Sequence, residues 1–314
     1  MKLVRYEHHG SVLLGIVHHD MVKDLPRGLD ALTVLNLPIV ERNLLEAQAG
    51  RRHRASIDQV RLLPPIEPRA MRDFVAFERH ISGMKKGEGA AGVPDAWYEA
   101  PVFLFMNPWS VIGAYDDVPI PPDTSALDYE LEIAVVVGRA THNVAEEDAH
   151  GYIAGYCIMN DWSARDLQSR EMSVGLGPSK GKDFATTIGP WITTPDELES
   201  HVIDGRLALE MTVSINDVEI GRDSSAGMSW SFEQMLTHAS RGATVGAGDV
   251  LGSGTCAGGS LAEAWARAGQ QTPPPLQPGD VVTMSIEGLG SISNRVIAAE
   301  HVPAKVQPLV RSAP

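Results

Sequence analysis

Residues 127–138 read LDYELEIAVVVG, a run of aliphatic and β-branched residues that stops at a glycine. This composition favours a strand. Three further segments have the same character and are separated by Gly, Pro and Asp turns: IAGYCIMN (153–160), LALEMTVSIN (207–216) and DVVTMSIEG (280–288). The chain from about residue 69 onward is therefore predicted to form a mixed, β-dominated (α+β) domain.

Only a few segments favour helices. They are DFVAFERHISGMKK (73–86), AEEDAHGY (145–152), WSARDLQSREM (162–172) and SFEQMLTHASRG (231–242). The Gly-rich stretch KKGEGAAGVPDA (85–96) indicates a mobile loop, for which a lid is one possible use.

The N-terminal part of the chain has a different character. Residues 2–25 alternate and break at Gly10 and Gly15, which predicts short strands, and a polar, helix-like stretch follows over 41–54. Prolines 64, 65 and 68 then impose an extended connection. We therefore expect a small β-rich domain over residues 1–68 and a second, catalytic domain over 69–314.

Composition excludes several classes of partner. The chain has 314 residues, of which 43% are hydrophobic, and it contains no apolar run of the roughly 18 residues that span a bilayer. Its start, MKLVRYEHHG, lacks the apolar stretch of a signal peptide, so we expect a cytoplasmic protein without membrane contact. The formal charge of −14 repels polyanions, and we expect no nucleic-acid partner.

Two motif-like stretches and two cysteines carry no clear chemistry. GLGPSKGKDF (175–184) has the wrong spacing for a phosphate-binding P-loop, and GAGDVLG (246–252) does not fit the GxGxxG pattern of dinucleotide sites. Cys157 and Cys256 lie far apart in the sequence. We expect packed, reduced thiols, with a catalytic Cys256 as the alternative.

Four carboxylates suggest a metal site. Glu130 and Glu132 are alternate residues at the start of a predicted strand, so both point to one face, although such a pair also suits the solvent face of a half-exposed strand. Asp161 directly follows segment 153–160, and Asp73 begins DFVAFERH. Converging anions repel unless a cation neutralises them, and all-oxygen ligands favour Mg²⁺, Ca²⁺ or Mn²⁺.

Three blocks of the sequence together resemble the signature of the fumarylacetoacetate hydrolase family. They are LDYELEIAVVVG, MNDWSARDLQSREMSVGLGPSKGKDFATTIGPW (159–191) and GSGTCAGGSLAEAW (252–265). The match runs in the same order from about Arg69 to His301. It implies a mixed β-roll for the second domain, a homodimer, and a divalent metal, foremost Mg²⁺. The implied metal ligands are Asp73, Glu130, Glu132 and Asp161.

The same resemblance implies a catalytic histidine and its partner. His80 follows Asp73 by seven residues, which on one helix would place both side chains on the same face. Glu263 resembles the glutamate that orients this histidine, whereas Gly83, three residues after His80, cannot take that role.

Further residues match family positions that hold the substrate and the developing oxyanion: Lys182, Arg165, Gln168 and Thr255. For Arg165, an ion pair with Asp166 or Glu171 on an exposed helix face is the alternative. Two family tyrosines are replaced here, by Val75 and Met172. These replacements suggest a more apolar acyl pocket than fumarylacetoacetate would require.

The resemblance therefore predicts a metal-dependent hydrolase that cleaves a carbon–carbon bond in a small 1,3-diketo acid of the fumarylacetoacetate or acylpyruvate type. In this hypothesis His80 activates water, and Glu263 fixes the tautomer of the His80 imidazole. A second hypothesis retains the metal but replaces hydrolysis with decarboxylation, hydration or tautomerisation of a 2-oxo acid. A third is a catalytically silent binding or structural protein.

Overall fold

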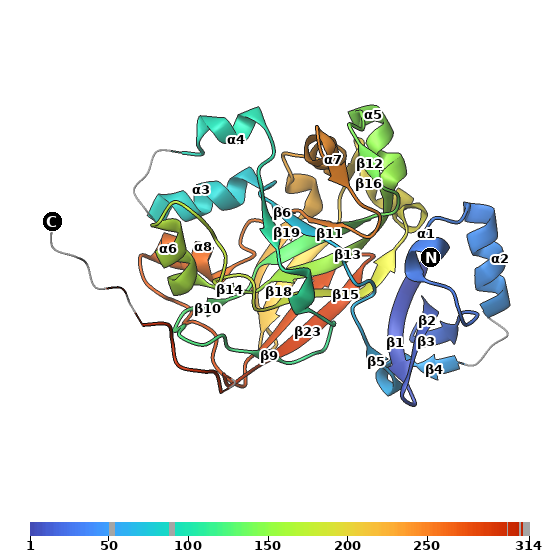
Figure 1. The fold of residues 1–314 in the computed structure, drawn as a ribbon, viewed down its shortest axis with the longest axis horizontal. Coiled ribbons are helices and arrows are strands. Elements are labelled where there is room, and N and C mark those ends of the chain that lie inside the picture. Colours follow the sequence, from blue (N-terminus) through green and yellow to red (C-terminus); the bar gives the residue numbers. More distant parts are fainter. Residues whose placement is uncertain (50–53, 88–91, 300, 308, 310–314) are drawn as a thin grey trace.

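A large mixed sheet forms the centre of the molecule (Figure 1). The structure is a computed structural model that describes residues 1–49, 54–87, 92–299, 301–307 and 309. The main path of this sheet runs, in spatial order, through β4 (Arg54–Ser56), β3 (Met21–Asp24), β2 (Ser11–His18), β1 (Lys2–His8), β15 (Thr186–Thr193), β13 (Ile153–Asp161), β11 (Leu131–Val137), β21 (Val250–Gly252), β6 (Met71–Phe74) and β7 (Phe103–Met106). In addition, β5 (Arg61–Leu62) pairs with β1 and β8 (Val111–Ile112) with β15.

A second sheet packs against the large one. Its strands are β19 (Val218–Ser224), β18 (Glu210–Ile215), β22 (Val281–Ile286), β23 (Gly290–Ile297) and β9 (Val118–Pro119). Short two-stranded pairs join β10 (Leu127–Asp128) to β14 (Ser163–Ala164), β12 (Thr141–His142) to β20 (Thr244–Val245), and β16 (Val202–Ile203) to β17 (Arg206–Leu207).

The position of strand β11 between two hydrophobic cores explains why its sequence is almost continuously apolar. Ile133 and Val135 belong to the core between the two sheets, together with Val213 and Met284 of the second sheet. Residues 134 and 136 point the other way, into a second core that includes residues 34 and 35 of α1 (Ala31–Leu35). Both faces of β11 are therefore buried, and no polar face is required.

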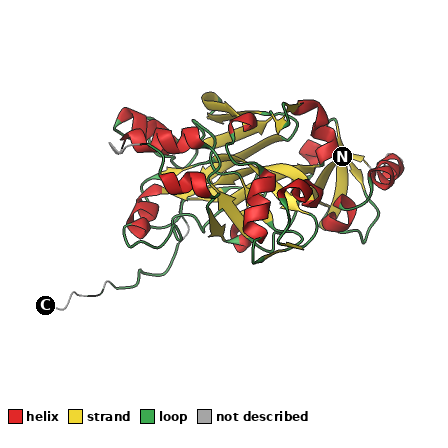
Figure 2. Cartoon of the chain, turned by 90° about the horizontal axis from the view of Figure 1, so that it is seen from above, coloured by secondary structure: helices red, strands yellow, loops and turns green. Residues whose placement is uncertain are grey.

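Helices surround the strands (Figure 2). Besides α1, they are α2 (Ile39–Ala49), α3 (Glu78–Gly87), α4 (Asp95–Glu99), α5 (Glu146–Ala149), α6 (Arg165–Met172), α7 (Phe232–Ser240) and α8 (Leu261–Ala268). Helices α3, α6 and α8 gather at one end of the molecule, away from the N-terminal strands (Figure 1). No described helix combines the length and the apolar character that a bilayer crossing requires.

The predicted fold class is confirmed, and each of the four strand segments contains a strand, over 131–137, 153–161, 210–215 and 281–286. One helix prediction is wrong in part. The segment 73–86 begins as strand β6, which pairs in parallel with β21, and helix α3 starts only at Glu78. Asp73 therefore lies on a strand, and the argument that placed it with His80 on one helix face does not hold.

The N-terminal region contains strands β1 to β3, as predicted, and its helix covers 39–49, while residues 50–53 of the predicted 41–54 lie outside the described part. Strand β1 pairs with β15, so this region extends the large sheet. The domain boundary at residue 68 stays a prediction. Of the predicted loop 85–96, residues 88–91 lie outside the described part. Residues 85–87 end α3, residues 92–94 are neither helix nor strand, and residues 95 and 96 begin α4.

Both cysteines are buried and unpaired, as expected for packed thiols. Burial raises the pKa of the Cys157 thiol to about 12. Burial, followed by the nearby carboxylate of Asp223, also raises the pKa of the Cys256 thiol well above its ordinary value. Neither thiol is therefore poised as a nucleophile, because nucleophilic attack requires the thiolate.

Candidate metal and catalytic site

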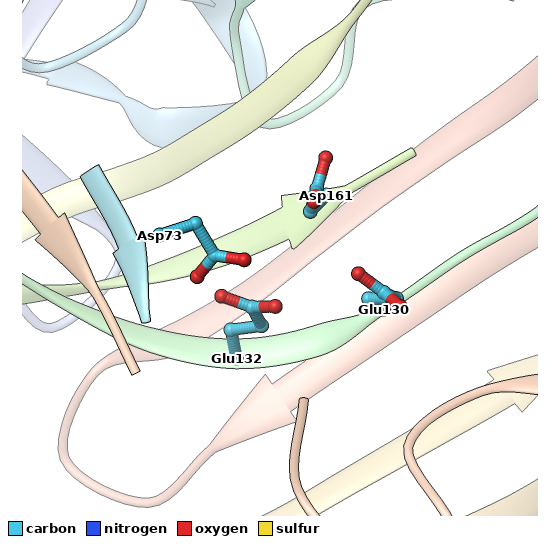
Figure 3. Close-up of side chains that lie close together, drawn as sticks. All are labelled: Asp73, Glu130, Glu132 and Asp161. Atoms are coloured by element: carbon cyan, nitrogen blue, oxygen red, sulfur yellow. The ribbon is translucent and has the colours of Figure 1, made fainter. Parts of the chain in front are cut away.

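Four carboxylates converge between neighbouring strands of the large sheet (Figure 3). Asp73 comes from β6, Glu132 from β11 and Asp161 from the end of β13, while Glu130 directly precedes β11. One oxygen from each lies within 4.8 Å of the others. All four side chains are buried, so the solvent-face alternative for Glu130 and Glu132 is excluded.

Sheet register brings these residues together. Strands β11 and β13 are antiparallel, with Leu131 opposite Asn160, so the start of one strand lies beside the end of the other. Between β11 and β6 runs β21, whose Gly252 pairs with Asp73 on one side and with Ala134 on the other. A Cβ atom at Gly252 would lie 3.0 Å from Oε2 of Glu132, so only glycine leaves the acids room to meet.

Burial and mutual repulsion disfavour the ionised forms of several of these acids. Burial raises the pKa of Glu132 well above its usual range, and the charge of Asp73 raises it further. Burial likewise raises the pKa of Asp161, and it raises that of Asp73 to about 6. Among the described residues, no donor bonds either oxygen of Glu132 or Oδ1 of Asp161. Buried acceptors of this kind, all oxygen, fit a hard divalent cation.

Two cations already stand beside the cluster. The Nζ of Lys182 contacts both Glu130 and Asp161, and the guanidinium of Arg165 lies 2.8 Å from Glu130. Burial opposes ionisation of Glu130, but Lys182, Arg165 and then His80 together hold its pKa well below the usual range. Glu130 is therefore ionised in the protein, whereas burial and the charge of Asp73 favour the protonated form of Glu132.

A histidine and a glutamate pair beside this cluster. The Nδ1 atom of His80, on α3, lies 3.0 Å from Oε2 of Glu263, on α8, and both residues are buried. Glu263 also accepts bonds from the Gly258 amide at 2.6 Å and from Arg267 at 2.6 Å. Burial tends to raise the pKa of Glu263, but the bonds from His80 and Gly258 outweigh it and lower that pKa.

Helices α3 and α8 approach closely at this pair. A Cβ atom on Gly83 would lie 2.5 Å from Oε1 of Glu263, so the small residue one turn after His80 makes room for the glutamate. No hydrogen bond to Nε2 of His80 occurs within the described part of the chain. If Nδ1 donates to Glu263, Nε2 is left as a free base.

Arg165 turns inward, and the carboxylates that it contacts do not belong to its own helix. Its Nε donates to Asp128 at 2.8 Å, and its NH1 donates to Oε1 of Gln168 at 3.0 Å. The alternative partners are engaged elsewhere: Asp166 accepts bonds from residues 124 and 125, and Glu171 accepts bonds from the amides of residues 179 and 181. The exposed ion pair considered for Arg165 is therefore wrong.

The remaining predicted residues lie at different depths. Thr255 is buried in the segment that links β21 to α8. Val75 directly follows β6, and its carbonyl accepts a 2.7 Å bond from the indole of Trp97. Met172, at the end of α6, is 56% exposed.

Sequence reasoning missed two buried polar residues at the site. Asp128 continues the alternation of Glu130 and Glu132, which was a usable signal, and it is fully buried. Asn160 accepts a 3.0 Å bond from the Glu130 amide through Oδ1, while its Nδ2 atom has no partner among the described residues. Its position next to Asp161 was the only hint in the sequence.

This chain is similar to known proteins in both sequence and structure. Residues 69–297 match the family model for the fumarylacetoacetate (FAA) hydrolase C-terminal region. Oxaloacetate tautomerase YisK of Bacillus subtilis (strain 168) is 30% identical over 245 residues, which cover 77% of this chain and 74% of that protein. Maleylpyruvate hydrolase of Aquipseudomonas alcaligenes is 26% identical over 310 residues, covering 93% of this chain and 98% of that protein.

Among solved structures, fumarylacetoacetate hydrolase from the psychrophile Exiguobacterium antarcticum superposes with a TM-score of 0.74 at 28% identity. The match covers 95% of this chain and 99% of that chain. The named relatives differ in activity, and the solved structure shares the fold. The family model alone covers well over half of the sequence, so this chain belongs to the fumarylacetoacetate hydrolase family.

Proposed function

We propose that this protein is a divalent-metal-dependent hydrolase that cleaves a carbon–carbon bond in a 1,3-diketo acid. The observation that carries the proposal is the 3.0 Å contact between His80 and Glu263 beside four buried carboxylates. A metal site alone serves many reactions, but a histidine oriented by a carboxylate activates water. Hydrolysis needs that activated water.

Asp73, Glu130, Glu132 and Asp161 would hold the metal, with Mg²⁺ as the first candidate and Mn²⁺ or Ca²⁺ as alternatives. When bound, such an ion supplies Lewis acidity that polarises carbonyl oxygens. The unpartnered oxygens of Glu132 and Asp161 support this assignment, because buried carboxylate oxygens need a donor or a cation.

His80 acts as the general base. Its Nε2 takes a proton from water, and the hydroxide attacks the carbonyl carbon distal to the carboxylate of the substrate. Glu263 keeps the Nδ1 proton in place and stabilises the imidazolium that forms. The tetrahedral carbon then expels the adjacent CH₂ carbon with the electron pair of the broken bond, and a proton adds to that carbon. One water is consumed, and the products are a carboxylate and an oxo acid, which is pyruvate from an acylpyruvate and acetoacetate from fumarylacetoacetate.

Lys182, Gln168 and Arg165 donate to the developing oxyanion and the substrate. Lys182 has three donors and uses two on carboxylates, and the amide nitrogen of Gln168 has no partner among the described residues. Each donor of this type contributes about 3 kcal/mol in comparable oxyanion sites. Thr255 is proposed to bind the substrate carboxylate through its hydroxyl.

A second candidate is tautomerisation of a 2-oxo acid such as oxaloacetate. It is favoured by the 30% identity to a protein of that activity over 77% of this chain. Decarboxylation or hydration of 2-oxo acids would use the same carboxylates and Lys182. The His80 and Glu263 pair discriminates these reactions, because only hydrolysis and hydration require an activated water.

A turnover screen tests the proposal. Purified protein, stripped with EDTA and reloaded with Mg²⁺ or Mn²⁺, would be given acetylpyruvate, longer acylpyruvates, fumarylacetoacetate and oxaloacetate. We expect metal-dependent release of pyruvate or acetoacetate from the diketo acids. Enolisation or decarboxylation of oxaloacetate without any diketo acid cleavage would replace the hydrolase with the second candidate. The homodimer and the cytoplasmic location stay proposals, and sedimentation analysis tests the former.

A further inference from the structure

Asp128 connects the two halves of the site. Its carboxylate is fully buried, and it lies on β10, two residues before Glu130. Strand β10 pairs with β14 so that Asp128 lies opposite Ser163, which brings the start of α6 and its Arg165 alongside. Asp128 itself has no role in the proposed metal binding or water activation.

One side of this carboxylate holds the start of α8. Oδ1 accepts the Leu261 amide at 2.8 Å, and Oδ2 accepts the Ala262 amide at 2.9 Å. These amides belong to the first turn of the helix, where backbone donors have no partner within the helix. Glu263 follows immediately, so the position of its carboxylate depends on how this turn is held.

The other side of the carboxylate holds Arg165. Oδ2 accepts Nε of Arg165 at 2.8 Å and lies 2.7 Å from its NH2, which also lies 2.8 Å from Glu130. A continuous chain of contacts therefore runs from the first turn of α8, through Asp128 and Arg165, to Glu130. It joins the helix that carries Glu263 to the carboxylate cluster.

We infer that Asp128 is a positioning residue that fixes the Glu263 helix relative to the carboxylate cluster, and so aligns His80 with the substrate. The catalytic consequence rests on the proposed function, whereas the chain of contacts from α8 through Asp128 and Arg165 to Glu130 is independent of it. A carboxylate suits this place because all of its neighbours are donors. In Asp128→Asn, the amide nitrogen replaces one of the two oxygens. In place of Oδ2 it would face the N–H groups of Ala262 and Arg165, and in place of Oδ1 that of Leu261, so at least one bond to α8 is lost.

The experiment compares Asp128→Asn with Asp166→Asn. Asp166 is a matched control, because it also accepts several hydrogen bonds at the start of α6 but makes none with α8 or the cluster in the described structure. Hydrogen exchange of the Leu261 and Ala262 amides reports the link directly. Ring ¹⁵N shifts of His80 report whether Nδ1 still carries the proton that faces Glu263. Titration with Mn²⁺ and steady-state kinetics complete the set.

In Asp128→Asn we expect about tenfold faster exchange at Leu261 or Ala262, whichever amide loses its acceptor, since such a change corresponds to the loss of one hydrogen bond. We also expect a mixed His80 tautomer and kcat lowered by roughly ten- to a hundredfold with KM little changed. Asp166→Asn should change none of these. Unaltered exchange and ¹⁵N shifts in Asp128→Asn, or the same changes in Asp166→Asn, would overturn the inference.

A second variant keeps the test decisive. If Asp128→Asn does not fold, Arg165→Lys keeps the positive charge but removes the two-pronged contact with Asp128. We expect it to increase exchange at Leu261 and Ala262, although Arg165 itself does not touch α8, and unchanged exchange would count against the link. Exchange and ¹⁵N shifts need no substrate. If they change as expected while no diketo acid is cleaved by the unsubstituted protein, the positioning role holds and the proposed function fails.

Discussion

Gly252 leaves the space into which the carboxylate of Asp73 projects, since a Cβ atom there would stand 2.7 Å from Oδ1 of Asp73. The same atom would stand 2.2 Å from the methyl carbon of Met159, a flexible end that can move aside. Gly252→Ala should therefore displace Asp73 more than it disturbs the fold. We expect Mn²⁺ affinity to fall by about tenfold or more, equivalent to 1.4 kcal/mol, as measured by calorimetric titration.

Gly151→Ala is the matched control for that change. The nearest heavy atom to an added Cβ at Gly151 is the NH2 of Arg139 at 3.6 Å, an ordinary contact on the surface. The Gly151→Ala variant should bind Mn²⁺ with unaltered affinity. Equal affinity in both variants would mean that the space at Gly252 is irrelevant to the metal.

Glu132→Gln should separate metal binding from stability. Glu132 is fully buried, and burial with the charge of Asp73 raises its pKa, so a neutral amide resembles the protonated form. We expect the metal-free variant to be at least as stable as the unsubstituted protein. The increase in Tm on adding Mg²⁺ should shrink strongly, because a ligand that binds only the folded state stabilises it in proportion to the logarithm of its affinity.

Differential scanning fluorimetry with and without EDTA measures both quantities. Glu147→Gln, a change of an exposed acid on α5, should leave the metal-induced increase intact. A full metal response in Glu132→Gln would remove Glu132 from the proposed ligand set.

Much of the fold was predictable because local composition and tertiary context agree. β11 and β13 are buried on both faces and have the apolar runs of strands. The segment after Arg72 was predicted as helix throughout because Asp73 and Phe74 are the end of strand β6. This strand has only four residues, too few to show the alternation of a strand before the helix begins. Helix α8 was missed, although Ser260 and Glu263 have the spacing of a capping box and Gly269 ends the helix with a φ of 68°.

The site was predictable only as far as the motifs reached. Alternation placed Glu130 and Glu132 on one face, but no local pattern shows that Asp73 meets them across Gly252, because that depends on the parallel pairing of β6 with β21. The contact between His80 and Glu263 joins residues 183 positions apart. The family resemblance supplied those residues, and long-range sheet pairing and helix packing supply the reason that they meet.

The stability of the metal-free protein should depend on Glu263 in a defined direction. Its folded-state pKa is lowered, because bonds from His80 and Gly258 outweigh burial. An acid of this kind adds stability that is fully present above its unfolded pKa of about 4.3 and is lost as pH falls through the lower folded value. The difference in unfolding free energy between the unsubstituted protein and Glu263→Gln should be constant from pH 7 to about 5.5 and shrink below about pH 4.

Urea unfolding in EDTA at several pH values measures this difference. Glu199→Gln, an exposed acid, should show a small difference with little pH dependence. A Glu263→Gln difference that grows as pH falls would mean that Glu263 is protonated in the folded protein.

Substrate preference should follow the apolar replacements. Val75 lies directly after β6, the strand that carries Asp73, and offers no polar group at a position where the family resemblance implies a tyrosine. We expect a higher kcat/KM for acetylpyruvate than for fumaryl substrates, and Val75→Tyr should raise the relative value for the fumaryl compound about tenfold. Met172→Tyr should do less, because Met172 is 56% exposed. A hundredfold preference of the unsubstituted protein for the fumaryl compound would contradict this.

The division of labour between the carboxylates and the histidine pair gives the sharpest prediction. His80→Ala should leave Mn²⁺ affinity nearly intact, because His80 is not a proposed ligand, yet lower turnover of a diketo acid by roughly a hundred- to ten-thousandfold, the usual contribution of a general base. Glu263→Gln should have a smaller effect, since its amide can still orient the ring but lacks the charge that stabilises the imidazolium. The two effects should not add in the double variant if the residues act as one unit.

Oxaloacetate provides the internal comparison for these variants. Its decarboxylation needs no attacking water, so any such activity should survive both changes, and His142→Ala, a change of an exposed histidine, should alter neither reaction. The measurement is kcat and KM for both substrates in the unsubstituted protein and the four variants at saturating Mn²⁺. Loss of oxaloacetate turnover in parallel with diketo acid hydrolysis would mean that His80 serves a step common to both, such as proton transfer at carbon. Unaltered diketo acid hydrolysis in His80→Ala would eliminate His80 as the base.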